Sequence, residues 1–183
     1  MLLPLHAAGI YTGQEQASCS DYLVSSYTPS IAALLHAQKS YKPVRRSDAD
    51  MLLVAVDQPF QGTALPMAIE EADTVQGLVS SSAKVMRVAR CGQMLEHIRS
   101  APILHLACHG TQNPLNALQS SFYLEDGQLP VSRLMELDLP LAFLAVLSAC
   151  ETARGDAAQP DQAIHLAATM LFAGFKSVVA TMW

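Results

Sequence analysis

Apolar residues along this chain gather in short runs, separated by polar segments that contain glycine and proline. The clearest run, Ala142–Leu147, is continuously apolar, which is typical of a strand buried on both faces of a sheet. Met51–Val56 and Ile103–Ala107 have a similar character, and a last apolar run covers Ser177–Trp183. This pattern predicts a sheet whose central strands are covered on both sides.

Segments with helical periodicity lie between these runs. Asp161–Ala173 gathers its apolar residues on one face, and Gly174 directly after it is suited to end a helix. Pro66–Ser80 carries acidic residues early, where they favour the helix dipole. Further helices are expected at Ile31–Gln38, Gly92–Arg99 and Pro130–Leu137, and further strands at Asp21–Tyr27 and Lys84–Ala89. The alternation of strand and helix predicts a parallel sheet covered by helices.

A hairpin is expected between the Ile103–Ala107 and Ala142–Leu147 runs. Phe122–Leu124 is followed by Glu125-Asp126-Gly127, a sequence typical of a tight turn between two strands. The connection is longer than a bare crossover helix. We therefore expect its loop to overhang the edge of the sheet, where such loops often shape a substrate groove.

Two of the buried runs end in residues that can carry chemistry. Cys150 follows Ala142–Leu147 after two small residues, and His109 comes just after Ile103–Ala107. If the two runs are parallel neighbours, both side chains lie at the carboxyl edge of the sheet, where ligands gather in α/β folds. A thiolate at this edge can attack a substrate as a nucleophile, while an imidazole accepts and donates the protons of the reaction. Gly110 lacks a Cβ, so its backbone N–H can approach a developing oxyanion.

Other interpretations of these polar residues remain open. Cys150 can also be a buried structural thiol, and Cys108 is expected to face the core. His105, inside a buried strand, is expected to be a core histidine with a hydrogen-bond partner. Asp161 can receive a basic substrate side chain or equally begin a helix, and Glu151 is expected to be a solvated loop acid.

Composition and charge narrow the possible function classes. The 183 residues are 51% hydrophobic and 15% charged, as in a globular protein of one domain. The formal charge of −5 argues against broad binding to nucleic acid or anionic membranes, and no apolar run is long enough to cross a membrane. The four cysteines lack the spacing of a zinc site and indicate reduced thiols in the cytoplasm or nucleus: Cys19, Cys91, Cys108 and Cys150.

Several motifs resemble those of one known family. They are ILHLACHG, AFLAVLSACETARGD, QAIHLAATMLFAGFKSVVATMW and, near the start, LPLHAAG and SSYTPSIAALLHA. Together they are similar to the CHAT domain, a caspase-like group of cysteine peptidases related to separases and usually carried behind tetratricopeptide repeats. The details resemble the large fungal branch of that family.

The resemblance implies a fold and an activity for residues 1–183. The fold is an α/β, caspase-like three-layer sandwich with a mostly parallel central sheet and helices on both faces. The activity is that of an endopeptidase acting on proteins or peptides, with His109 as the catalytic histidine and Cys150 as the nucleophile. The backbone N–H groups of Gly110 and Cys150 would form the oxyanion hole. No metal or organic cofactor is implied.

The chain departs from the family pattern in two respects. Many relatives have an acidic pair before the last helix, where this chain has Asp161-Gln162, so an acidic contribution to substrate choice is weaker. Relatives also continue past the final tryptophan and carry repeats upstream. We therefore expect a domain that lacks its C-terminal part, within a full-length chain that contains tetratricopeptide repeats.

Three functions follow as hypotheses. The leading one is a cysteine endopeptidase in regulated proteolysis or in cell-death or defence signalling. The alternative is a non-catalytic, caspase-like interaction or scaffold module, because a sheet without its last strands exposes an edge that can pair. A nucleotide-dependent α/β enzyme is disfavoured, since no glycine-rich phosphate-binding motif follows any expected strand.

Overall fold

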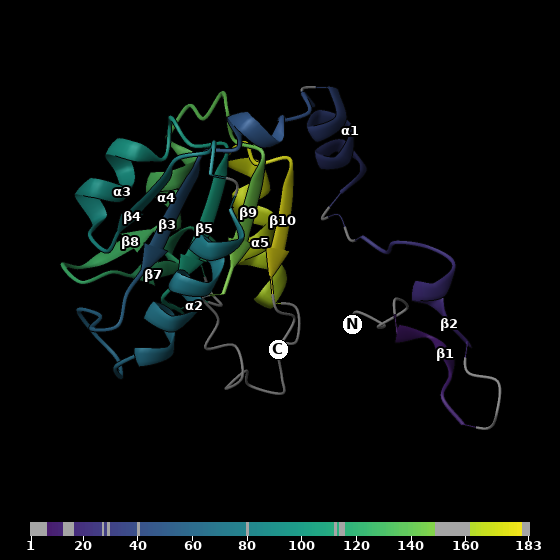
Figure 1. Ribbon diagram of the computed structural model, residues 1–183, viewed down its shortest axis with the longest axis horizontal. Helices are drawn as coiled ribbons and strands as arrows, with labels where there is room; N and C mark the ends of the chain where they lie inside the picture. The colour runs from purple at the N-terminus through teal and green to yellow at the C-terminus, as the bar shows by residue number, and fades with distance from the viewer. Residues whose placement is uncertain are drawn as a thin grey trace.

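A five-stranded parallel sheet lies at the centre of the protein (Figure 1). The computed structural model describes residues 7–12, 17–26, 28, 30–39, 41–79, 81–111, 113, 116–148 and 162–180. In this part of the chain the strand order is β10-β9-β5-β3-β4, and every neighbouring pair is parallel. The strands are β3 (Met51–Ala55), β4 (Val85–Val88), β5 (Ile103–Ala107), β9 (Leu144–Leu147) and β10 (Ser177–Ala180).

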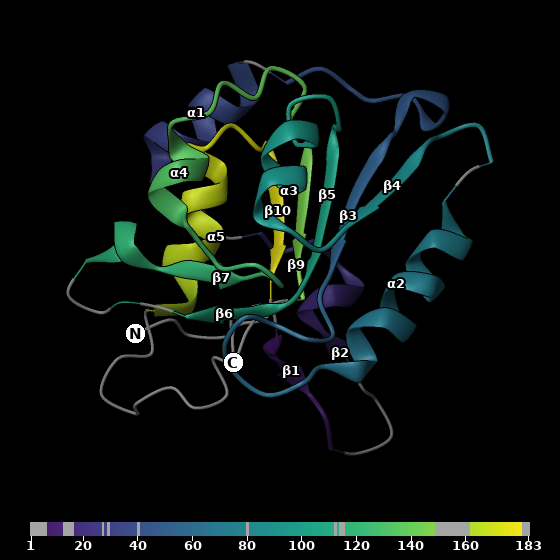
Figure 2. The same ribbon diagram turned by 90° about the vertical axis from the view of Figure 1, so that its left-hand side faces the viewer.

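Helices cover both faces of this sheet, as Figure 2 shows, which confirms the expected α/β sandwich of three layers. Successive side chains of a strand point to opposite faces of the sheet. On one face, Ala72 of helix α2 packs with Leu53 and Ala55 of β3; on the other face, the main core contains Leu52 and Val54. Helix α2 covers the face of the sheet on which Leu53 lies, and α3, α4 and α5 cover the opposite face. The helices are α1 (Ile31–Lys39), α2 (Pro66–Leu78), α3 (Cys91–His97), α4 (Val131–Met135) and α5 (Gln162–Phe172).

The connection between β5 and β9 contains a small antiparallel sheet of its own. It consists of β6 (His109–Thr111), β7 (Ser121–Tyr123) and β8 (Gln128–Pro130), paired in the order β6-β7-β8. The turn between β7 and β8 is closed by the N–H of Leu124, which donates to the carbonyl of Gly127 at 2.9 Å. The predicted hairpin is therefore confirmed, with a third strand that the sequence pattern did not show.

The expected strand at Asp21–Tyr27 is wrong. Cys19–Asp21 instead forms a short 3₁₀ turn, after the two-residue strands β1 (Gly9–Ile10) and β2 (Ala17–Ser18). The Asp21 carboxylate accepts hydrogen bonds from both the N–H and the hydroxyl of Ser18, at 2.6 and 3.0 Å. Such local side-chain bonds compete with strand pairing, and Tyr22 and Val24 of this segment remain exposed.

The remaining elements agree with the sequence pattern to within a few residues. Gly174 has a φ of +118°, the left-handed conformation expected just after a helix, which confirms its role at the end of α5. Two further 3₁₀ turns lie in loops, at Arg46–Asp48 and Ala117–Gln119. For example, α5 is shorter than the predicted Asp161–Ala173, α1 is one residue longer than Ile31–Gln38, and β5 coincides with Ile103–Ala107.

We expect Phe122→Ala to destabilise the protein by about 3–5 kcal/mol, because it empties the space of a large aromatic side chain. Phe122 is 0% exposed in the main core and pairs with Gly110 across β6 and β7. Urea unfolding followed by circular dichroism measures the loss. Phe60→Ala, at a side chain 63% exposed, is the matched control and should change the midpoint little; equal midpoints for both variants would contradict this packing.

Candidate active site

The carboxyl ends of β5 and β9 lie side by side at one edge of the parallel sheet. Leu106 pairs with Leu147, and the N–H of Ser148 donates to the carbonyl of Leu106 at 2.8 Å. The predicted neighbourhood of these two strand ends is confirmed. Cys150 itself, the proposed nucleophile, lies outside the described residues, as do Glu151 and Asp161.

His109 is the first residue of β6 and is only 7% exposed. Its Nε2 lies 2.8 Å from the carbonyl oxygen of Thr63 and 3.4 Å from the Thr63 hydroxyl. A carbonyl oxygen can only accept a hydrogen bond, so Nε2 carries the proton and donates it. In the neutral imidazole, Nδ1 is then the nitrogen that can accept a proton, as a catalytic base must.

The loop that supplies Thr63 is fastened to the sheet by backbone hydrogen bonds. It leaves β3 at Val56, whose N–H donates to Ala107 at 3.0 Å, and the N–H of Phe60 donates to Leu124 at 2.8 Å. Next to Thr63, Gly62 has a φ of +107°, and a Cβ built there would lie 2.9 Å from Cδ2 of His109. The loop therefore positions the imidazole through a main-chain carbonyl and a missing side chain.

Sequence analysis missed the role of this loop. A carbonyl acceptor leaves no side-chain signature, so the pattern of apolar and polar residues does not reveal this contact. The position of a glycine between a buried strand and the helix that starts at Pro66 was the available signal. That signal indicates a tight approach but does not name the group that approaches.

Gly110 follows His109 on β6 and is half-buried. It pairs with Phe122 across the small sheet, which holds its backbone beside the imidazole-bearing residue. The predicted role of its N–H in an oxyanion hole stays a prediction.

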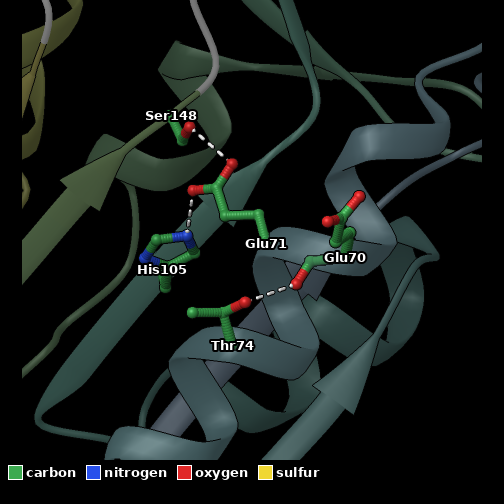
Figure 3. Close-up of polar contacts among 5 residues, drawn as sticks. All are labelled: Glu70, Glu71, Thr74, His105 and Ser148. Carbon is green, nitrogen blue, oxygen red and sulfur yellow. Dashed lines mark hydrogen bonds and ion pairs between the residues drawn. The ribbon is translucent and has the colours of Figure 1, made fainter.

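His105 and Cys108 occupy the structural positions expected for them. Cys108 is 2% exposed and belongs to the main core. His105 is 5% exposed, and its Nε2 lies 2.8 Å from Oε1 of Glu71 on α2, so the expected core histidine has its partner. The other carboxylate oxygen of Glu71 accepts a hydrogen bond from the Ser148 hydroxyl at 2.8 Å (Figure 3).

The bonded role of Glu71 was also missed. The sequence pattern placed it among acids that favour the helix dipole, but the first turn of α2 contains no acidic residue. Glu71 lies one turn further along, where its side chain reaches the sheet. Its acceptor role depends on a histidine in β5 and a serine after β9, which are far from it in sequence.

Cys91, at the start of α3, lies in surroundings that suppress its ionisation. Burial, followed by the nearby Asp126 carboxylate, raises the pKa of the Cys91 thiol to about 11. The N–H of Cys91 donates to Asp126 at 2.8 Å, and this bond holds the pKa of that carboxyl below its usual range. Cys91 is therefore a poor candidate for a nucleophile.

A cavity of about 980 Å³ opens at the opposite, amino edge of the sheet. Its lining includes the residue directly before each parallel strand: Asp50, Lys84, Pro102, Phe143 and Lys176. Because the strands are parallel, this cavity is separated from the candidate site by the length of the sheet. It does not bring the predicted catalytic residues together.

Neither a metal-binding cluster nor a membrane-spanning helix occurs in the part of the chain that the structure describes. No cluster of three or more histidine, cysteine, aspartate or glutamate side chains there is arranged to hold a metal ion. In the same residues, no helix has the length and apolar character needed to span a membrane.

The five-stranded parallel sheet with helices on both faces is an α/β sandwich of the caspase-like type. The chain belongs to the CHAT domain family, whose model matches residues 1–183. That family is related to the caspase-like cysteine peptidases. A search of curated proteins found no match.

We expect Gly62→Ala to reduce stability by about 1–3 kcal/mol, because it places a side chain in the left-handed region and against the His109 ring. Gly77→Ala is the matched control, since a Cβ there meets nothing within 4 Å and helix α2 gains a better helix former. Urea unfolding of both variants beside the wild type measures the difference. An unfolding midpoint for Gly62→Ala at or above that of Gly77→Ala would rule out the tight approach.

Proposed function

We propose that this chain is a cysteine endopeptidase that cleaves protein or peptide substrates with a dyad of Cys150 and His109. The observation that carries the proposal is the setting of His109. Its buried imidazole is held by the Thr63 carbonyl at the end of β5, and the neighbouring strand β9 runs toward Cys150. Membership of a family related to cysteine peptidases supports the same reaction class.

In the proposed reaction, the Cys150 thiolate attacks the carbonyl carbon of the scissile peptide bond. The negative charge that develops on the carbonyl oxygen is stabilised by the N–H groups of Gly110 and Cys150. The carbon–nitrogen bond then breaks, and protonated His109 gives its proton to the leaving amine. Water, deprotonated by His109, hydrolyses the resulting thioester and restores the thiolate.

Substrate choice and context belong to the same proposal. Caspase-like enzymes tend to require one residue type before the scissile bond, and Asp161 is the proposed contact for a basic side chain. Tetratricopeptide repeats in a longer chain, a reducing compartment such as the cytoplasm or nucleus, and a role in regulated proteolysis are proposed on the family resemblance.

A non-catalytic interaction module is the second candidate. Strand β10 lies at the edge of the parallel sheet, and within the described residues only β9 pairs with it. Its Val179 is 57% exposed. An edge strand with an exposed apolar side chain is a surface on which another strand can pair. This arrangement needs no reactive thiol, which separates it from the first candidate.

We expect a peptide-linked thiol alkylator to label Cys150 rapidly in the wild type. The rapid labelling should be absent in Cys150→Ala, which has no thiol at this position, and should become slow in His109→Ala. Cys91 should react slowly, because a pKa of about 11 leaves about one thiol in a thousand ionised at pH 8. Buried Cys108 should also be slow. Mass spectrometry of the digested protein assigns the label to each cysteine over time.

Two results would contradict the peptidase proposal. One is labelling that spreads at similar slow rates over all accessible cysteines, with no dependence on His109. The other is proteolysis that survives Cys150→Ala. Either result favours the interaction module.

A further inference from the structure

One carboxylate, that of Glu71, joins three elements at the carboxyl edge of the sheet (Figure 3). It projects from α2; its Oε1 lies 2.8 Å from Nε2 of His105 in β5, and its Oε2 lies 2.8 Å from Oγ of Ser148 after β9. Glu70, the preceding residue of the same helix, makes neither contact, and its side chain is directed away from the sheet. The two adjacent acids therefore differ sharply in role.

Each oxygen of the Glu71 carboxylate has a hydrogen-bond partner. An ionised carboxylate only accepts, so the imidazole N–H of His105 and the hydroxyl of Ser148 both donate to Glu71. His105 is 5% exposed, and removal of Glu71 would leave its ring without this partner. An unsatisfied buried donor is costly, which makes the carboxylate a fixed anchor rather than a loosely held surface group.

Ser148 is the residue that this anchor controls. Its N–H already donates to Leu106, which continues the pairing of β5 and β9 by one residue. The side chain of Ser148 takes no part in that pairing, since the bond is made by its backbone N–H and the residue is exposed. The bond to Glu71 adds a second, independent tether just where the strand ends.

The position of Ser148 in the sequence gives this tether its significance. Two peptide units separate Ser148 from Cys150, a reach of at most about 7 Å. The chain beyond the last backbone bond of a strand can leave in many directions. A tether from the strand end to a helix limits those directions before the chain reaches the cysteine.

The loop before α2 also contacts His109, the histidine of the proposed dyad. Thr63, which binds His109, lies just before α2, and Glu71 lies in its second turn. One loop and helix thus contact both strand ends, and a shift of α2 would move the two contacts together. Figure 2 shows α2 along the sheet, with its beginning at the edge where β5 ends.

We propose that Glu71 is a positioning residue, which holds Ser148 and so fixes the direction in which the chain leaves β9 toward the nucleophile. This inference rests on the proposed cysteine chemistry. It assigns to His105 the role of orienting the Glu71 carboxylate, and to Ser148 the role of transmitting its position. None of the three is a catalytic residue.

The test compares Ser148→Ala, Glu71→Ala and the double variant, with Glu70→Ala as the matched control. We expect the rate of Cys150 alkylation and the kcat for a cleaved peptide to fall about 10- to 100-fold in each, with KM little changed, because small misplacements of reacting groups cost that much. The rates of the double variant should fall no further than those of the worse single variant, since both substitutions remove the same bond between Glu71 and Ser148. Glu70→Ala should retain the wild-type rates.

The conservative variant Glu71→Gln should recover most of the rate. A glutamine amide can accept from His105 through its oxygen and donate to the Ser148 hydroxyl through its nitrogen. Hydrogen exchange of the peptide that covers residues 144–152 should rise in Ser148→Ala, while urea unfolding shows an unchanged midpoint. A purely structural role would lower the midpoint and leave the rates of the folded protein alone.

The outcomes separate this inference from the proposed function. Fast, His109-dependent labelling of Cys150 that persists in Ser148→Ala and Glu71→Ala overturns the positioning role and leaves the peptidase proposal intact. Labelling in the wild type that is no faster than in His109→Ala overturns both. If Glu71→Ala does not fold, Ser148→Ala decides alone, because it removes only an exposed hydroxyl.

Discussion

The parallel pairing of β5 with β9 determines where chemistry can occur in this protein. It aligns Leu106 with Leu147, so the two strands end at the same level and their following residues emerge at one edge. On one face the pairing is buried by α3, α4 and α5, where Ala145 and Leu147 of β9 join the main core; on the other face α2 contacts β5 through the bond of Glu71 to His105. A strand covered in this way cannot slip without exposing its apolar side chains, and the level of the two strand ends is fixed by the core.

The parallel sheet and its helices could be predicted from the sequence because burial on two faces leaves a continuous apolar run. Ala142–Leu147 and Ile103–Ala107 both contain the strands that form, although β9 is fully buried on one face only and β5 includes His105. The short strand β6 could not be predicted in this way. It follows β5 after a single residue, and its pairing depends on Ser121–Tyr123, which is adjacent only after the hairpin forms. At Asp21–Tyr27 the pattern misled, because a local carboxylate bond outweighed strand propensity.

For the candidate site, sequence analysis identified residues by the chemistry of their own side chains. His109 and the core residues His105 and Cys108 were found in that way, and the structure shows how deeply each is buried. The partners that hold them were not found. Thr63 acts through its backbone, and Glu71 acts on residues of two distant strands. Long-range acceptors of this kind become visible only when the chain is folded.

The bond between His109 and the Thr63 carbonyl has a consequence for how variation in this protein is understood. Every residue at position 63 provides the same carbonyl oxygen, so exchange of the threonine side chain leaves the acceptor in place. That contact therefore depends on the path of the main chain, and hence on loop length and on glycine at position 62. A comparison of side-chain identities alone would overlook a group on which the orientation of the imidazole depends.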